Sequence, residues 1–164
     1  TVLYAEAYRE KYAEFLKTDF PRIPFTADFD LFQALAALGK RLVDLHLLRS
    51  EELDPPLARF EGKGDGRVAK TERQGFRYDL QEARVYINPG QYFAPVPQEV
   101  WEYQIGGYQV LEKWLKDRRE RRLGLEESKT YCRIVTALQC TIAIQEEIDS
   151  LYPEIEKKIV DIII

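Results

Sequence analysis

The sequence has little of the material from which most enzyme sites are built. Its 164 residues include one histidine, two cysteines and no methionine. Cys132 and Cys140 lie in a segment with helical spacing, which separates them by about 12 Å, whereas a disulfide spans at most roughly 7 Å between Cα atoms. We therefore expect two unpaired cysteines, and the lack of a Cys-x-x-Cys pair argues against a zinc site.

A long apolar run and an excess of positive charge are also missing. A membrane span needs about 20 apolar residues in sequence, and we find neither such a run nor a signal peptide. The net charge of −4, from 24 Lys and Arg against 28 Asp and Glu, argues against a general polyanion binder. We expect a single cytoplasmic domain over residues 1–164, a C-terminal fragment of a longer protein, that touches no membrane and binds nucleic acid only through a local basic patch.

The common catalytic and nucleotide-binding motifs are absent as well. The sequence contains no GxGxxG, P-loop, GxSxG or HExxH pattern. His46 lies between two leucines and is expected to be a core or boundary residue. Carboxylate pairs such as Glu51-Glu52 fall near predicted helix starts, where negative charge favours the helix dipole. We expect no catalytic residue and no metal site in this chain.

The first 60 residues have helical spacing. Apolar residues recur every three or four positions in residues 4–16 and again in residues 29–48. Between them, two prolines predict an extended connector at residues 20–25, and Asp28 is the predicted N-cap of the second helix.

A glycine-rich turn at residues 61–66 marks a change to alternating patterns. Residues 67–73, 76–80 and 83–88 are predicted as three short antiparallel strands, followed by a proline-punctuated loop at residues 91–97. The third strand carries an apolar face, while the opposite face of the sheet is polar and partly basic.

Helical spacing returns from residue 98 to residue 164. The pattern predicts a short helix near residues 99–103, a bend at Gly106-Gly107, a helix that runs into a basic segment ending before Gly124, and a long last helix from about Leu125. The fold class is therefore α+β: N-terminal helices (1–60), a small antiparallel sheet of about three strands (61–97) and C-terminal helices (98–164).

Two polar features carry the functional hypothesis. The polar sheet face and its loops hold side chains of types that pair with base edges or lie beside them, and the base-reading candidates are Arg67, Arg73, Arg77, Arg84, Asn88, Gln91 and Tyr92. The basic segment either binds phosphates or complements the dipole of a helix end, and its phosphate candidates are Lys113, Lys116, Arg118, Arg119 and Arg122.

Several long motifs resemble one family. Residues 8–12 (Tyr-Arg-Glu-Lys-Tyr), Leu16 and residues 19–24 (Asp-Phe-Pro-Arg-Ile-Pro) resemble the segment after the catalytic domain of bacterial N6-adenine DNA methyltransferases and Type ISP restriction-modification enzymes. Residues 84–88 and 101–118 resemble the C-terminal specificity domain of the same family. The resemblance spans roughly residues 3–151.

The resemblance implies a target recognition domain that reads duplex DNA for an upstream methyltransferase domain of the same polypeptide. Asn88-Pro89-Gly90-Gln91 retains only the first two residues of the family's catalytic tetrad, so no cofactor is expected in this chain, and S-adenosylmethionine is expected in the upstream domain. Two alternatives remain: a protein-interaction module that docks through its C-terminal helix, ending in residues 159–164, and a small hydrolase with an unrecognised carboxylate site.

Overall fold

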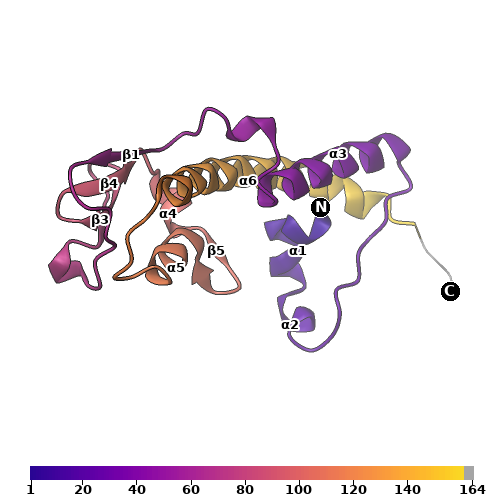
Figure 1. Cartoon of the computed structure of the whole chain (residues 1–164). Helices are drawn as coiled ribbons and strands as arrows, with labels where there is room; N and C mark the ends of the chain where they lie inside the picture. Colours follow the sequence, from indigo (N-terminus) through magenta and orange to yellow (C-terminus); the bar gives the residue numbers. More distant parts are fainter. Residues whose placement is uncertain (161–164) are drawn as a thin grey trace. The chain divides into compact units, whose positions relative to one another are not determined.

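The computed structural model describes residues 1–160, which form two compact units. The first unit contains Thr1–Leu47 and the residues from Cys140 onward, and the second contains Leu48–Gln139. The long helix α6 (Leu125–Lys157) supplies residues to both units (Figure 1).

The first unit is helical, as predicted. It contains a short 3-10 helix, η1 (Val2–Tyr4), and three α-helices, α1 (Glu6–Lys11), α2 (Ala13–Leu16) and α3 (Phe29–His46), besides the C-terminal part of α6. The predicted first helix is divided at Tyr12, where the backbone leaves the helical region at φ −107° and ψ 17°. Helix α3 begins where predicted, since the Asp28 carboxylate accepts hydrogen bonds of 3.1 Å from the backbone N–H groups of Asp30 and Leu31.

The core of the first unit uses one stripe of α3. Its four buried leucines are Leu35, Leu38, Leu42 and Leu45. Phe29 and Phe32, which the spacing assigned to the same stripe, are exposed because a helix turns about 100° per residue and they lie to one side of these leucines. Gly39 allows close packing, since a Cβ there would collide with the Thr1 hydroxyl.

The C-terminal segment pairs with the connector before α3. Ala27 donates a backbone hydrogen bond to Lys158 at 2.6 Å, and Val160 donates one to Phe25 at 2.8 Å. The predicted docking segment, residues 159–164, therefore begins in an antiparallel bridge within this unit, and residues 161–164 lie outside the described part of the chain.

The second unit is built on a four-stranded antiparallel sheet. The strands are β1 (Arg59–Gly62), β2 (Arg77–Asp79), β3 (Arg84–Asn88) and β4 (Gln91–Ala94), in the order β1-β4-β3-β2 (Figure 1). Two of the three predicted strands are confirmed as β2 and β3. The α+β class is confirmed with them.

Two predictions about the sheet were wrong. The segment predicted as a loop at residues 91–97 begins with β4, because Pro89-Gly90 forms the turn of a β3–β4 hairpin instead of ending the sheet. The segment predicted as a strand at residues 67–73 is extended only at its start and then enters a 3-10 helix, η3 (Glu72–Gln74). Its extended part pairs with residues 120–123, since Val68 donates to Arg121 and Glu120 donates to Val68.

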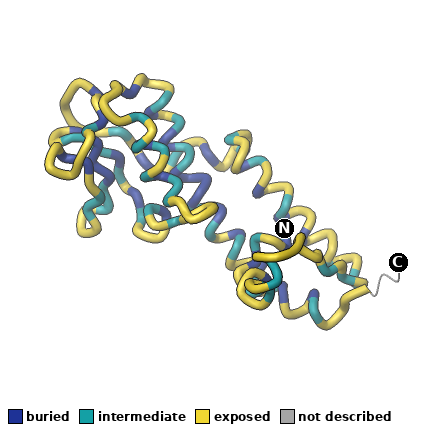
Figure 2. Tube along the Cα trace, turned by 90° about the horizontal axis from the view of Figure 1, so that it is seen from below, coloured by how far each residue is buried: buried dark blue, intermediate teal, exposed yellow. Residues whose placement is uncertain are grey.

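Strand alternation separates the two faces of the sheet. Phe60, Phe93 and Val85 lie opposite one another on the inner face, where the Phe93 ring centroid is 4.2 Å from that of Tyr131 on α6. In the Cα trace of Figure 2, coloured by burial, the buried residues are interspersed with intermediate and exposed ones, and among the strands the buried positions fall in β3 and β4. The opposite, outer face carries the polar residues, as the alternation predicted.

The remaining elements of the second unit follow the predicted order. They are the 3-10 helix η2 (Glu51–Leu53), the helices α4 (Gln98–Glu102) and α5 (Val110–Lys116), and a hairpin of β5 (Gln104–Ile105) and β6 (Tyr108–Gln109). Gly106 and Gly107, both with positive φ, form the two-residue hairpin turn that the predicted bend required. Cys132 and Cys140 are free thiols, as expected.

Candidate nucleic-acid interface

A row of four side chains crosses the outer face of the sheet. The strand register places Glu61 opposite Tyr92, Tyr92 opposite Tyr86, and Tyr86 opposite Arg77. Arg84, two positions before Tyr86, lies on the same face because side chains alternate along a strand. Three of the base-reading candidates therefore meet on this surface, which we call the outer sheet face: Arg77, Arg84 and Tyr92.

The two arginines of this face stack on its two tyrosines. The Arg77 guanidinium carbon lies 3.9 Å from the Tyr86 ring centroid, and that of Arg84 lies 4.3 Å from the Tyr92 ring centroid. The tyrosine rings also contact each other, with centroids 5.1 Å apart. Stacking fixes the plane of each guanidinium and favours the cation through the ring quadrupole.

Two carboxylates accept hydrogen bonds from the side chains of this cluster. Glu82 accepts hydrogen bonds of 2.8 Å from both the Tyr86 hydroxyl and Arg84 Nη1, and Glu61 accepts one of 3.2 Å from the Tyr92 hydroxyl. Burial, followed by the hydrogen bond to the Glu61 carboxylate, raises the pKa of Tyr92, which stays protonated near neutral pH. Both tyrosine hydroxyls act as donors to carboxylates.

The outer sheet face carries no excess of charge. By register Arg59 joins Arg77 and Arg84 on it, while Glu61, Asp79 and the neighbouring Glu82 supply three carboxylates. A surface so balanced has little general attraction for phosphate. Its chemistry suits short-range hydrogen bonding more than electrostatic anchoring.

Two of the predicted base readers have structural roles instead of exposed edges. Gln91 is buried, 6% exposed, and its Oε1 accepts from the Gly66 N–H at 2.7 Å and from Asn88 Nδ2 at 3.0 Å. Asn88 also donates to the Arg67 carbonyl at 3.0 Å and accepts from the Gly90 N–H at 3.0 Å. These amides hold the loop before η3 against the β3–β4 hairpin.

Arg67 and Arg73 lie beside the sheet, on the segment that was predicted as a strand. Both are exposed, Arg67 at the bridge to Arg122 and Arg73 within η3. A shallow pocket of about 300 Å³ opens next to Arg67, lined also by Lys70, Gln74 and Asn88. The base-reading candidates are thus divided between the outer sheet face and this neighbouring loop.

The basic segment is helical only in its first part. Lys113 and Lys116 lie in the last turn of α5, whereas Arg118, Arg119 and Arg122 follow the end of that helix. Lys113 pairs with Asp117 at 2.6 Å and Lys116 pairs with Glu112. These two lysines fit the dipole interpretation, since they lie where a cation complements a helix C-terminus.

Most of the arginines in this segment hold the fold together. Arg118 stacks on Trp114, with its guanidinium carbon 3.6 Å from the ring, and pairs with Glu127 at the start of α6. The Gly124 N–H, followed by the nearby arginines, lowers the pKa of the Glu127 carboxyl, which stays ionised. Arg122 pairs with Asp65 at 3.2 Å.

Arg119 differs from the other phosphate candidates. It is exposed and forms no ion pair within residues 1–160, and its guanidinium carbon lies 5.7 Å from the Phe76 ring. Phe76 is buried and lies two positions before the inward-facing Tyr78, so its contact with Arg119 does not place this cation on the outer sheet face. The sequence marked the whole segment as basic but gave no sign of which cation is unpaired.

Sequence reasoning also missed Arg59, Glu61 and Glu82. The first two lie on β1, whose residues Arg-Phe-Glu-Gly include a single apolar side chain and therefore give no alternating pattern. Glu82 lies in the β2–β3 turn, and its hydrogen bond with Tyr86 depends on how β2 pairs with β3, which the spacing of residues in the sequence does not show. Knowledge that residue 77 pairs with residue 86 would have located this turn beside Tyr86.

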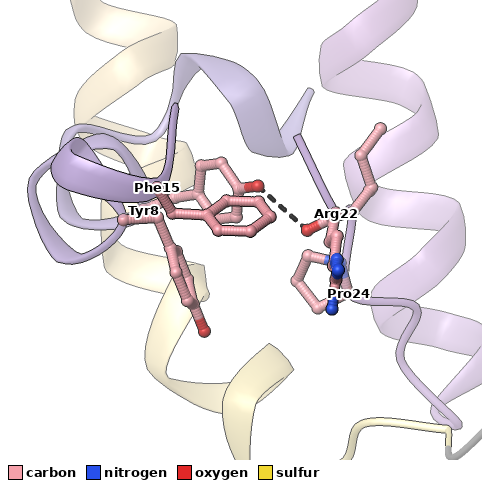
Figure 3. Close-up of a pocket in the computed structure, with 6 residues that line it drawn as sticks. Tyr8, Phe15, Arg22 and Pro24 are labelled. Atoms are coloured by element: carbon pink, nitrogen blue, oxygen red, sulfur yellow. Dashed lines mark hydrogen bonds between the residues drawn. The ribbon is translucent and has the colours of Figure 1, made fainter. Parts of the chain in front are cut away.

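The first unit contains a further pocket and the one histidine of the sequence. In the first unit, Tyr8, Phe15, Arg22 and Pro24 line a pocket of about 340 Å³, where the Tyr8 hydroxyl donates to the Arg22 carbonyl at 2.9 Å (Figure 3). His46 contacts the hydroxyls of Tyr4 and Thr141 through its two ring nitrogens, and burial lowers its pKa. Among residues 1–160 no group of histidine, cysteine or carboxylate side chains could hold a metal ion, and no helix is suited to span a membrane.

Comparison with known proteins identifies a family. The family described as "Type ISP C-terminal specificity domain" matches residues 1–147. No curated protein sequence matches the chain.

Three solved structures share the fold. One is a nuclease-deletion mutant of the Type ISP restriction-modification enzyme LlaGI in complex with a DNA substrate mimic (TM-score 0.61, 23% identity, 89% of this chain and 13% of that chain). The others are the DrdV–DNA complex (0.59, 22%, 91% and 17%) and the ATP-dependent Type ISP enzyme LlaBIII bound to DNA (0.62, 17%, 90% and 10%). The chain thus spans between a tenth and a sixth of these proteins, and at such identities the likeness concerns the fold.

Proposed function

Because the chain belongs to the family of Type ISP C-terminal specificity domains, we propose that it recognises a specific duplex DNA sequence for an N6-adenine methyltransferase carried on the same polypeptide. The family match over residues 1–147 is the observation that carries the proposal. S-adenosylmethionine binds the upstream methyltransferase domain in this proposal, in the cytoplasm, and this chain supplies sequence recognition without a cofactor of its own.

The outer sheet face and the basic segment have different roles in DNA binding in this proposal. The outer sheet face, with its balanced charge and oriented arginines, contacts base edges, together with Arg67 and Arg73 on the adjoining loop. Residues beyond the end of α5, with Arg119 unpaired among them, contact phosphates. This division follows the general pattern in which phosphate contacts position a protein on DNA and base contacts specify the sequence.

The acidic net charge of −4 agrees with this division. Non-specific affinity for DNA comes mainly from phosphate contacts, so a chain with more carboxylates than cations relies on other parts of its polypeptide for anchoring. We expect weak DNA binding by the 164 residues alone and sequence-dependent binding in the intact polypeptide.

The test is selection from a randomised duplex library by the intact polypeptide, followed by a methylation assay on the selected duplex. We expect one enriched sequence, affinity for it that falls with salt, and transfer of a methyl group to an adenine within or beside it. A polypeptide that enriches no sequence, or that methylates random DNA equally well, would contradict the proposal. A version lacking this chain serves as the control and should lose the preference.

A further inference from the structure

Arg77 is an arginine of the outer sheet face whose guanidinium lies over an aromatic ring while its hydrogen-bonding groups stay free within residues 1–160. It is exposed, and its guanidinium forms no hydrogen bond or ion pair within residues 1–160. The Tyr86 ring covers one face of the guanidinium at 3.9 Å. Because the N–H groups lie in the guanidinium plane, a ring stacked on its face leaves all of them available at the edge.

In Arg84, part of the guanidinium already forms hydrogen bonds within the chain. Its Nη1 donates to Glu82 at 2.8 Å and contacts the Tyr86 hydroxyl at 3.3 Å, and its charge is balanced by the Glu82 carboxylate. These contacts raise its pKa further and fix its position. Arg77 and Arg84 are therefore not equivalent, since the Arg84 guanidinium is held by Glu82 and Tyr86 while the planar Arg77 guanidinium keeps its N–H donors free.

Tyr86 holds the Arg77 fork in place, and Glu82 holds Tyr86. The Tyr86 side chain is almost completely covered, its ring tilts against Tyr92, and its hydroxyl donates to Glu82 at 2.8 Å. Glu82 is itself placed by the β2–β3 turn, in which the Asp79 carboxylate accepts the N–H groups of Gln81 and Glu82 at 3.1 Å. A chain of contacts thus runs from the turn through Glu82 and Tyr86 to Arg77.

From this geometry we infer that Arg77 reads one guanine in the major groove and that Glu82 is a positioning residue acting on it through Tyr86. The inference rests on the proposed function and names the base class at one position of the site. A planar fork with two parallel N–H donors matches the O6 and N7 acceptors of guanine, which no other base pair presents together in the major groove. Pre-orientation on Tyr86 reduces the entropy lost when the fork pairs.

The experiment is a base-by-base specificity profile of the intact polypeptide, measured by competition among duplexes that differ from the selected site at one base pair. We expect the unaltered protein to prefer guanine at one position by about 5- to 150-fold. Arg77→Ala should remove the preference at that position alone and leave affinity for random DNA nearly unchanged. Arg49→Ala, which removes an exposed arginine that lies on no strand of the sheet, is the control and should keep it.

The positioning role has its own variants. Tyr86→Phe keeps the ring and removes the hydroxyl, and Glu82→Ala removes the acceptor, so each should weaken the guanine preference partially. The double variant should be no worse than Glu82→Ala alone, because that change already breaks the hydrogen bond which Tyr86→Phe removes. Glu82→Gln retains an acceptor oxygen and should restore most of the preference, which a change in general stability would not explain.

The outcomes separate this inference from the proposed function. If the intact polypeptide shows no sequence preference, the proposed function fails. If preferences exist but none is for guanine, or if Arg77→Ala weakens all duplexes equally, the guanine assignment to Arg77 is wrong while the proposed function stands. If Glu82→Ala and Tyr86→Phe leave the profile unchanged, Arg77 reads its base without the positioning chain.

Discussion

Neutralising Arg119 should reduce the salt dependence of DNA binding more than neutralising any paired cation of the basic segment. Each phosphate contact to duplex DNA contributes about 0.9 to the slope of log affinity against log salt, through release of condensed counterions. Between 50 and 200 mM salt one contact therefore accounts for an affinity change of about 3.5-fold. Arg119→Gln should remove that share, because this guanidinium lies free beside Phe76.

The matched comparison is the double variant Lys113→Gln with Asp117→Asn, which deletes an ion pair without changing net charge. It should leave the slope unaltered, as should Arg49→Gln, which removes an exposed arginine that belongs to no strand of the sheet and lies outside the basic segment. Binding of one selected duplex would be followed by fluorescence anisotropy at several salt concentrations. The lost stacking of Arg119 on Phe76 costs only about 0.5–1 kcal/mol, so the variant should remain folded.

The result that would refute this reasoning is an unchanged slope in a folded Arg119→Gln variant. A reduced slope in the Lys113–Asp117 double variant would refute it from the other side, since it would mean that a paired lysine contacts phosphate. The first result would favour the dipole interpretation of the basic segment. The second would indicate that the phosphate contacts are distributed over several of its cations. The assay therefore distinguishes phosphate-contacting cations from ion-paired cations in the basic segment, which the sequence pattern alone could not separate.

Three further predictions concern the chain itself. The 164 residues alone should bind no S-adenosylmethionine, and calorimetry that found micromolar binding would contradict the assignment of the cofactor to another domain. Because burial lowers the pKa of His46, the unfolded chain takes up its proton at a higher pH than the folded chain does. Stability present above about pH 6.5 should thus decline as the pH falls towards 5, by more than in a His46→Gln variant measured by urea unfolding. Gly75→Ala should destabilise the second unit by at least about 1 kcal/mol in the same assay, because this residue has a φ of +100° and a Cβ would collide with Pro89; an unchanged midpoint would show that the turn before β2 can rearrange.

The features that could be predicted from sequence are those with a local cause. Helix α3 follows from its leucine stripe and the Asp28 cap, and β2 and β3 follow from alternation. The β5–β6 bend follows from two glycines that tolerate positive φ. Each of these patterns is contained in a few consecutive residues, so it needs no knowledge of tertiary contacts.

The features that could not be predicted depend on partners far along the chain. Strand β1 has only four residues and is recognisable through its pairing with β4, and the extended residues at 67–68 pair with the turn after α5 instead of the sheet. Gln91 has the side chain of a base reader, yet a buried hydrogen bond to Gly66 gives it a structural role. For the same reason charge composition located the basic segment without revealing that Arg119 alone among its phosphate candidates is unpaired.

The pairing between the loop before η3 and the turn after α5 bears on how such a domain can change its target. Three main-chain hydrogen bonds join them, from Val68 to Arg121, from Glu120 to Val68 and from Leu123 to Gly66. Main-chain bonds of this kind survive almost any exchange of exposed side chains. Arg67, Arg73 and Arg119 can therefore be replaced one at a time while the loops that carry them stay in register. If these residues contact DNA as proposed, a new recognition sequence can arise through single substitutions, because each intermediate variant still folds.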